Sequence, residues 1–185
     1  MPEQNYFTDY FNHLHNRLKT VNSADLVHAA QLAFNAHQQK RKIICAGNGG
    51  SAAMASHVTV DFTKAAGMRA VNFNEADLLT CFANDYGYEN WVAKALEFYA
   101  DEGDLVILIS SSGQSPNMVN GAEQAKAMKL PLVTLSGFRS DNPLRTMGDV
   151  NLWVDSIAYN IVEMTHHVWL LAIIDYLIEQ QREQS

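Results

Sequence analysis

The chain has 185 residues, 48% of them hydrophobic and 18% charged, and its 13 basic and 20 acidic residues give a net charge of −7. This length and composition fit one domain with a substantial core and argue against a disordered chain. The acidic balance argues against a nucleic-acid or membrane surface built on bulk positive charge, although it leaves room for a local anion site.

Cysteine content and the start of the chain indicate a cytoplasmic protein. Only two cysteines occur, Cys45 and Cys81, which excludes a disulfide scaffold and fits a reducing compartment. Residues 1–5 are polar and no run of about 18 apolar residues is apparent, so neither a signal peptide nor a membrane-spanning helix is expected. We expect no membrane and no nucleic acid as partners.

Helical patterns open the chain, and strand and helix patterns alternate after them. Residues 1–40 are predicted to be helical, because apolar side chains recur at spacings of three and four, and Ser23 is expected to cap the second helix. No linker or repeat divides the chain. We therefore expect a single domain, 1–185, in which a helical segment, 1–40, precedes an α/β core, 41–185, that ends in a long helix.

The alternation after residue 41 predicts a parallel sheet. The expected strands and helices are both apolar, and strands that are apolar throughout are typical of sheets buried on both faces. An α/β fold in three layers, with helices on both faces of the sheet, is therefore expected. Strands are predicted at 42–46, 70–73, 104–109, 132–135 and 150–154, and helices at 52–64, 88–100, 116–128 and 161–181.

Two predicted strands end in loops of small polar residues, and each loop opens a helix. In the first loop, 47–51, glycines let the backbone approach a ligand, and Asn48 and Ser51 add side-chain donors. The second loop, 110–115, carries four serines around Gly113. Free N–H groups and the helix dipole attract an anion at such a place, and ligands of open α/β sheets bind beyond the carboxyl ends of the strands.

The chemistry of these loops favours a phosphate monoester. Neither loop has the lysine of a P-loop or the spacing G-x-G-x-x-G, so no nucleotide cofactor is expected. A cradle of serines without lysine suits the phosphate of a small molecule better than a nucleoside triphosphate. The alternative is that both loops are tight turns with solvated serines, but their position after two strands favours one shared site.

Three motifs in order carry a family resemblance: residues 47–51, residues 83–88 with the sequence ANDYGY, and residues 110–115. Together they resemble the sugar isomerase (SIS) domain, and within it the phosphoheptose isomerase branch, over nearly the whole chain. The DnaA initiator-associating protein shares this scaffold and is a regulator rather than an isomerase.

The resemblance implies a flavodoxin-like, five-stranded parallel sheet flanked by helices, with the segment 1–40 serving assembly. It implies a homotetramer with active sites between subunits. It also implies that the protein binds a phosphorylated sugar and interconverts sedoheptulose 7-phosphate and D-glycero-D-manno-heptose 7-phosphate through an enediol, for lipopolysaccharide or capsule heptose. The residues expected to bind the substrate are Asn48, Gly49, Gly50, Ser51, Asp85, Ser110, Ser111, Ser112 and Ser115.

Isomerisation needs a base beside the carbonyl and a second group that manages the oxygens of the enediol. His57 and Asp61 are four residues apart, so they share one helix face just after the first loop. This spacing suits a metal site or an acid–base pair, and the alternative is a solvent-facing pair. The family has a histidine as metal ligand and a glutamate as catalytic base at these positions, so Asp61 is one methylene shorter.

The final helix departs further from the family pattern. The family's glutamate matches Glu163, but its glutamine and histidine positions hold Val162 and Leu170. His166 lies between Val162 and Leu170 on one helical line, so we expect it, or less readily His167, to replace the missing histidine. The alternative for this histidine pair is helix packing or a subunit contact.

The sequence therefore predicts an aldose–ketose isomerase of a phosphorylated sugar, with or without one zinc ion per site. A non-catalytic phosphosugar-binding or regulatory protein is the alternative function, which the lost polar positions favour and the retained ionisable groups oppose. A third reading is an isomerase of another phosphorylated sugar. The catalytic candidates are Asp61, His166 and Glu163, and the zinc candidates are His57, Asp61 and His166.

Overall fold

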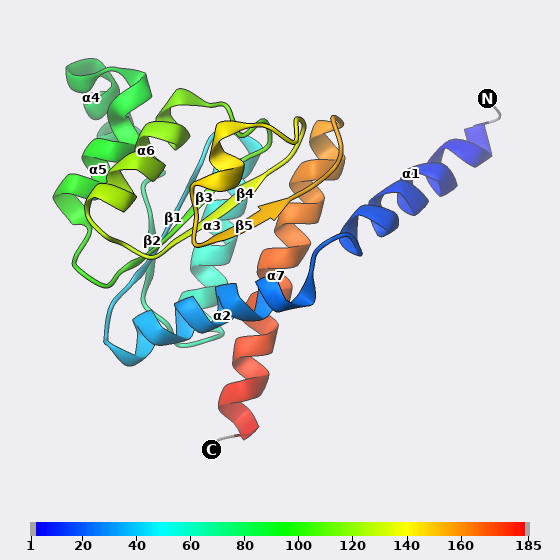
Figure 1. Ribbon diagram of the computed structural model, residues 1–185, viewed down its shortest axis with the longest axis horizontal. Coiled ribbons are helices and arrows are strands. Elements are labelled where there is room, and N and C mark those ends of the chain that lie inside the picture. Colours follow the sequence, from blue (N-terminus) through cyan, green and yellow to red (C-terminus); the bar gives the residue numbers. More distant parts are fainter. Residues whose placement is uncertain (1–2, 184–185) are drawn as a thin grey trace.

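The computed structural model describes residues 3–183, so residues 1–2 and 184–185, the outer ends of the predicted domain 1–185, lie outside the described residues. Its five strands are all parallel and form one sheet in the order β2-β1-β3-β4-β5 (Figure 1). The expected five-stranded α/β fold is confirmed. The strands are β1 (Ile43–Gly47), β2 (Ala70–Asn72), β3 (Leu105–Ser110), β4 (Leu132–Ser136) and β5 (Val150–Trp153).

Helices cover both faces of the sheet, as the apolar strands predict. Because side chains alternate along a strand, Ile43 and Cys45 of β1 pack with α2, α3 and α7, while Ile44 and Ala46 pack toward α4, α5 and α6. The two helical layers are visible on either side of the sheet in Figure 1. The helices are α1 (Glu3–Leu18), α2 (Ser23–Gln38), α3 (Gly50–Lys64), α4 (Ala76–Tyr86), α5 (Trp91–Tyr99), α6 (Pro116–Ala127) and α7 (Tyr159–Glu183), with short 3-10 helices η1 (Tyr88–Asn90) and η2 (Pro143–Thr146).

Two local predictions need correction. The side chain that caps α2 belongs to Asn22, whose Oδ1 accepts the Ala24 N–H at 3.0 Å, while the predicted cap Ser23 is already helical. Helix α4 was not expected from the sequence. It is short, and only Phe82 is buried within it, so its apolar period is too brief to stand out.

Helix α7 is the longest helix of the described chain, and it is apolar along much of its length. It has 25 residues and, within residues 3–183, is long and apolar enough by length and composition to cross a membrane, with a mean hydropathy of 1.4 over its best window. Half of that window is buried inside the protein, and α7 packs against α1, α2 and α3. These contacts make α7 a core helix of this fold, so its length and composition are weak evidence for a membrane span.

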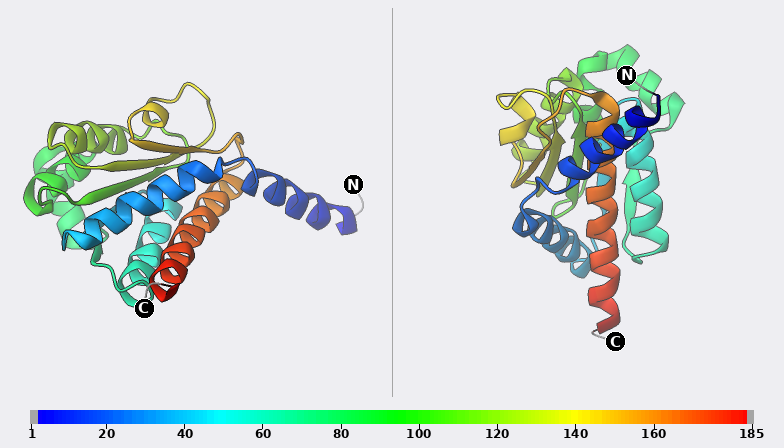
Figure 2. Two further views of the ribbon diagram at one scale, coloured as in Figure 1. Left: turned by 60° about the horizontal axis from the view of Figure 1, so that its bottom comes forward. Right: turned by 90° about the vertical axis from the view of Figure 1, so that its right-hand side faces the viewer.

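Helix α1 extends away from the body of the protein, as Figure 1 and the left view of Figure 2 show. Its side chains Tyr6, Phe7 and Phe11 are all exposed, each by more than half of its surface. An exposed aromatic face of this kind is typical of an interaction surface. The role of the segment 1–40 in assembly stays a prediction.

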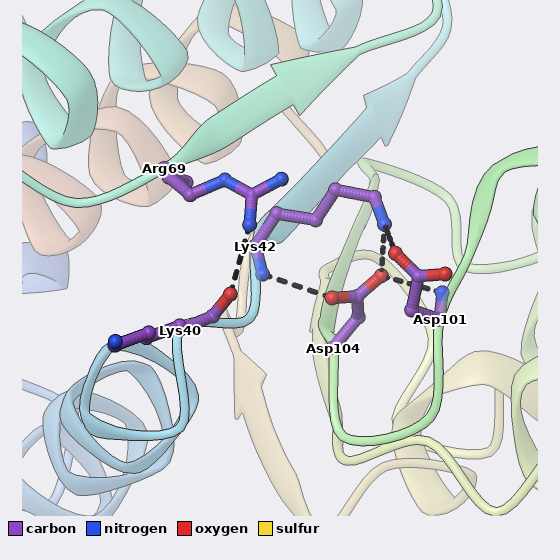
Figure 3. A network of polar contacts seen from close by, with 5 residues as sticks. All are labelled: Lys40, Lys42, Arg69, Asp101 and Asp104. Carbon is purple, nitrogen blue, oxygen red and sulfur yellow. Dashed lines mark hydrogen bonds and ion pairs between the residues drawn. The ribbon is translucent and has the colours of Figure 1, made fainter.

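A network of polar contacts around the buried Asp104 joins the strands at the end of the sheet where the chain enters β1 and β3 (Figure 3). The fully buried Asp104 accepts the backbone N–H of Lys42 at 2.8 Å and that of Asp101 at 2.7 Å, and it pairs with the Lys42 ammonium. Lys42 Nζ also donates to Asp101 at 2.7 Å, and Arg69 donates to the Lys40 carbonyl at 2.8 Å. The network ties together the segments that lead into β1, β2 and β3.

Candidate functional site

The two predicted loops meet at the point of the sheet where ligands of this topology bind. In the order β2-β1-β3, β2 is the neighbour of β1 on one edge and β3 is its neighbour on the other. The chain therefore runs from β1 to β2 in one direction across the sheet and later crosses back to β3. The loops after β1 and β3, 47–51 and 110–115, therefore lie side by side at the carboxyl edge, at a topological switch point. The sequence prediction that both loops form one site is consistent with this placement.

A cavity of about 130 Å³ lies between the loops and the start of α7. Its volume is below the roughly 300–1,000 Å³ of usual small-molecule pockets, so it suits a phosphate group, with the rest of a ligand extending outward. Most of the expected substrate-binding side chains line it. The lining residues are Asn48, Ser51, Ile109, Ser110, Ser111, Ser112, Ser115, Tyr159 and Glu163.

Neutral donors, rather than cations, face this cavity. Ser111 is only 6% exposed, and its hydroxyl has no hydrogen-bond partner among the described residues. A buried hydroxyl without a partner is costly, so it favours a ligand that can accept from it. The N-terminal residues that begin α3 and α6, Gly49 and Ser115, make no side-chain cap in the described part of the chain. Several first-turn N–H groups already donate to loop carbonyls, those of Ser51 and Ala52 to Asn48 and those of Met118 and Val119 to Ser115. The dipoles of both helices still favour an anion at these N-termini.

The serine loop depends on glycine at one position. Gly113 has φ +64°, and a Cβ there would overlap Oδ1 of Asn142. The buried Asn142 holds the neighbouring loop, because its Nδ2 donates to the carbonyls of Gly137 at 3.1 Å and Arg139 at 2.7 Å. A side chain at position 113 would displace either the serine loop or the Asn142 side chain that holds the neighbouring loop.

We expect Gly113→Ala to weaken both stability and phosphate binding, and Gly67→Ala provides a matched control. Gly67 has a similar φ of +66°, but no described atom lies within 4 Å of its Cβ position. The control should lose about 1–2 kcal/mol from backbone strain alone. Gly113→Ala should lose more, and in a titration with a sugar phosphate it alone should show weaker binding. Equal losses in the two variants would contradict the proposed clash.

Glu163 reaches the cavity from α7. Its carboxylate lies against Gly50, the first residue of α3, where a Cβ would overlap it. Gly50 therefore contributes by leaving space, and the dipole of α3 favours the negative charge at that place. Among the described residues that line the cavity, Glu163 is the one with a carboxylate.

A row of ionisable side chains continues from Glu163 along the contact of α3 with α7. His57 Nε2 lies 3.3 Å from Asp61 Oδ2, so the predicted pairing of these two residues is confirmed. His57 Nδ1 shares a hydrogen bond of 2.8 Å with Nε2 of His167. Burial, and then the neighbouring His57, lower the pKa of His167. His167 follows Glu163 by one helical turn, roughly 6 Å along α7.

His166 does not join this row, so its predicted position was wrong. It is fully buried, and its Nε2 donates to the Ser136 carbonyl at 3.0 Å. Burial lowers its pKa to about 4, so the ring is neutral near pH 7. Val162, His166 and Leu170 do lie along one face of α7, as their spacing predicts, but all three side chains are buried in the core. His167 on the neighbouring face is the histidine that reaches His57.

Two further groups of predicted residues, Asp85 and the zinc candidates, are placed differently within one chain. Asp85 is exposed on α4, where it contacts Asn84 and Cys81, and it does not line the cavity. Among residues 3–183, no group of three His, Cys, Asp or Glu side chains could hold a metal ion. Both ring nitrogens of His57 already face protein partners, and His166 is elsewhere, so the expected ligand set does not fit zinc here.

Three residues near the cavity were not identified from the sequence. Tyr159 lines it from the first turn of α7 and packs edge-on against Phe138, with ring centroids 4.8 Å apart. Asn117 and Tyr88 both contact Asn48. Asn117 is only two positions after Ser115, and Tyr88 is the last residue of the ANDYGY motif. Their closeness in sequence to these motifs was the only feature of the sequence that could have indicated that they lie near the site.

Comparisons with known proteins agree with this geometry. A family model described as the SIS domain matches residues 6–137. The phosphoheptose isomerase of Fusobacterium nucleatum is 35% identical over 151 residues, which are 79% of this chain and 77% of that protein. Two solved phosphoheptose isomerases have the same fold. The one from Neisseria gonorrhoeae has a TM-score of 0.84 at 24% identity, covering 94% of this chain and 96% of that one. The one from Francisella tularensis has a TM-score of 0.85 at 22% identity, covering 97% and 100%.

Proposed function

The chain belongs to the SIS domain family, and from this premise we propose that it is an aldose–ketose isomerase of a phosphorylated sugar. The substrate we propose is sedoheptulose 7-phosphate, because the 35% identical relative is a phosphoheptose isomerase. The observation that carries the proposal is the unpartnered Ser111 hydroxyl in a cavity that Glu163 also lines. A phosphate would satisfy the first group, and the second is a carboxylate that can act as a base.

In this proposal, the phosphate accepts hydrogen bonds from the serines of loop 110–115 and from the starts of α3 and α6. Sedoheptulose 7-phosphate carries its carbonyl at C2. A base removes a proton from C1, the C1–C2 enediol forms, and return of the proton to C2 leaves an aldehyde at C1. The hydroxyl proton at C1 must also move to the oxygen at C2.

The positions along α7 support a division of these roles. The phosphate is on C7, so the reacting carbons lie at the far end of the sugar from the phosphate. Glu163 is next to the cavity, and His167 with His57 and Asp61 lies one turn further on. We assign proton transfer at carbon to Glu163, and transfer between the two oxygens to the histidine pair. No step is assigned to zinc, because His166 lies away from the other two expected ligands, His57 and Asp61.

The decisive experiment incubates the purified protein with sedoheptulose 7-phosphate, with added zinc and with a chelator, and measures formation of the aldose. Conversion supports the proposed isomerase, and the two additions test the predicted zinc ion. No conversion under any condition would contradict the proposal. Zinc, a homotetramer formed through α1 and a cytoplasmic location stay predictions.

The second candidate is a phosphosugar-binding or regulatory protein without catalysis. It is favoured by Val162 and Leu170, which place buried apolar groups where the family pattern has polar ones. The same sample separates the two functions. Calorimetric binding of the sugar phosphate without any conversion would favour this candidate over the isomerase.

A further inference from the structure

The side-chain amide of Asn48 is held by two residues that do not line the cavity. Asn48 Nδ2 donates to Asn117 Oδ1 at 3.0 Å, and Asn117 Nδ2 donates back to Asn48 Oδ1 at 2.8 Å. The hydroxyl of Tyr88 donates to the same Asn48 Oδ1 at 3.1 Å. The three side chains come from the loop after β1, from η1 and from α6, so three separate segments converge on one amide.

This arrangement leaves the amide only one way to meet a ligand. An amide oxygen accepts two hydrogen bonds, and Asn117 and Tyr88 supply both. The amide nitrogen has two N–H groups, of which one is used by Asn117. Within residues 3–183, the second N–H is the part of the Asn48 side-chain amide for which no hydrogen bond is seen. A rotation of the Asn48 amide by half a turn would place like atoms opposite each other in its pair with Asn117, whereas the Tyr88 hydroxyl could then accept from the nitrogen.

The two partners differ in how firmly they are placed. Asn117 is 1% exposed in the first turn of α6, directly after the serine loop. Tyr88 is 52% exposed at the start of η1, and its hydroxyl reaches back to Asn48. The buried residue fixes the plane of the amide, while the exposed one occupies the second acceptor position of its oxygen.

We propose that Tyr88 and Asn117 are positioning residues that fix the Asn48 amide as a hydrogen-bond donor to the bound phosphosugar. The inference rests on the proposed function, because it needs a phosphosugar in the cavity that Asn48 lines. A donor suits the oxygen-rich, anionic ligand, whereas a rotated amide would turn a lone pair toward it. Fixing the amide before binding also lowers the entropy lost when the ligand arrives.

Tyr88→Phe tests the inference, because it removes one hydroxyl from a half-exposed side chain and leaves the ring in place. Calorimetric titration with sedoheptulose 7-phosphate should show binding about threefold to tenfold weaker than for the wild type, as expected for one hydrogen bond. Tyr99→Phe is the matched control, since Tyr99 is 49% exposed on α5 and away from Asn48. It should bind like the wild type.

A double-mutant cycle separates positioning from direct contact with the ligand. If Tyr88 acts through Asn48, then adding Tyr88→Phe to Asn48→Ala should weaken binding no further. Full additivity of the two losses would mean that Tyr88 contacts the ligand itself, and would overturn the inference. Unchanged binding in the Tyr88→Phe single variant would overturn it as well.

Asn117→Leu extends the test to the buried partner. It should also weaken binding in the wild-type background and have little effect beside Asn48→Ala, provided that circular dichroism shows a folded protein. If the variant does not fold, the Tyr88 cycle alone decides. A wild-type protein that does not bind the sugar phosphate would contradict the proposed function itself, and the inference with it. Wild-type binding with insensitive variants would overturn the inference alone.

Discussion

Glu163→Gln is expected to lower kcat of the proposed isomerisation about 10²–10⁴-fold, the usual contribution of a general base. The substitution keeps the size of the side chain and removes its ability to take a proton. The phosphate is held by other residues of the cavity, so KM should change little by comparison. Steady-state kinetics with sedoheptulose 7-phosphate would measure both constants.

Two further variants make this prediction specific. Glu179→Gln changes an exposed glutamate of the same helix and should leave kcat unchanged. Asp61→Asn tests the carboxylate that the family pattern designates as base. A larger loss of kcat in Asp61→Asn than in Glu163→Gln would contradict the role assigned to Glu163 and return it to Asp61.

Asp104→Ala is expected to lower the free energy of unfolding by about 3–5 kcal/mol, the usual cost of removing one partner from a buried ion pair. The carboxylate is fully buried and accepts two backbone N–H groups besides pairing with Lys42. Its removal would leave these donors without an acceptor in the core. Urea denaturation followed by circular dichroism would measure the change.

Asp101→Ala is the matched comparison for Asp104→Ala. Asp101 pairs with the same Lys42 ammonium, but 65% of its side chain is exposed. An exposed ion-pair partner contributes little to stability, so the loss should be much smaller than for Asp104→Ala. Similar losses in both variants would show that burial of Asp104 is not what makes the network stabilising.

Local sequence was sufficient to predict the sheet and the position of its two polar loops. The strands are continuous apolar runs, and the loops 47–51 and 110–115 follow two of them directly, so composition and order alone indicate where both loops lie. The parallel topology then brings the loops together without further information. The pairing of His57 with Asp61 was predictable for the same reason, because a spacing of four fixes neighbours on a helix.

Relations between distant segments were not predictable in this way. Helical spacing shows that His166 shares a face with Val162 and Leu170, but it does not say whether that face meets the core or the site. In this structure the face packs into the core, because Val162 and Leu170 on either side of His166 are apolar and are buried. Likewise, Asn48 meets Asn117 and Tyr88 from 69 and 40 positions away, and only the folded chain brings them into contact.

The use of hydroxyls and helix N-termini in the cavity has a consequence for how fast a ligand arrives. Among the described residues that line it there is no lysine or arginine, and the chain as a whole carries a charge of −7. A sugar phosphate therefore approaches a protein of its own sign without long-range steering. Hydrogen bonds to neutral donors act only at contact, beyond the reach of ionic screening. Added salt should thus leave dissociation nearly unchanged and speed association slightly, the reverse of the behaviour of a phosphate site built on cations.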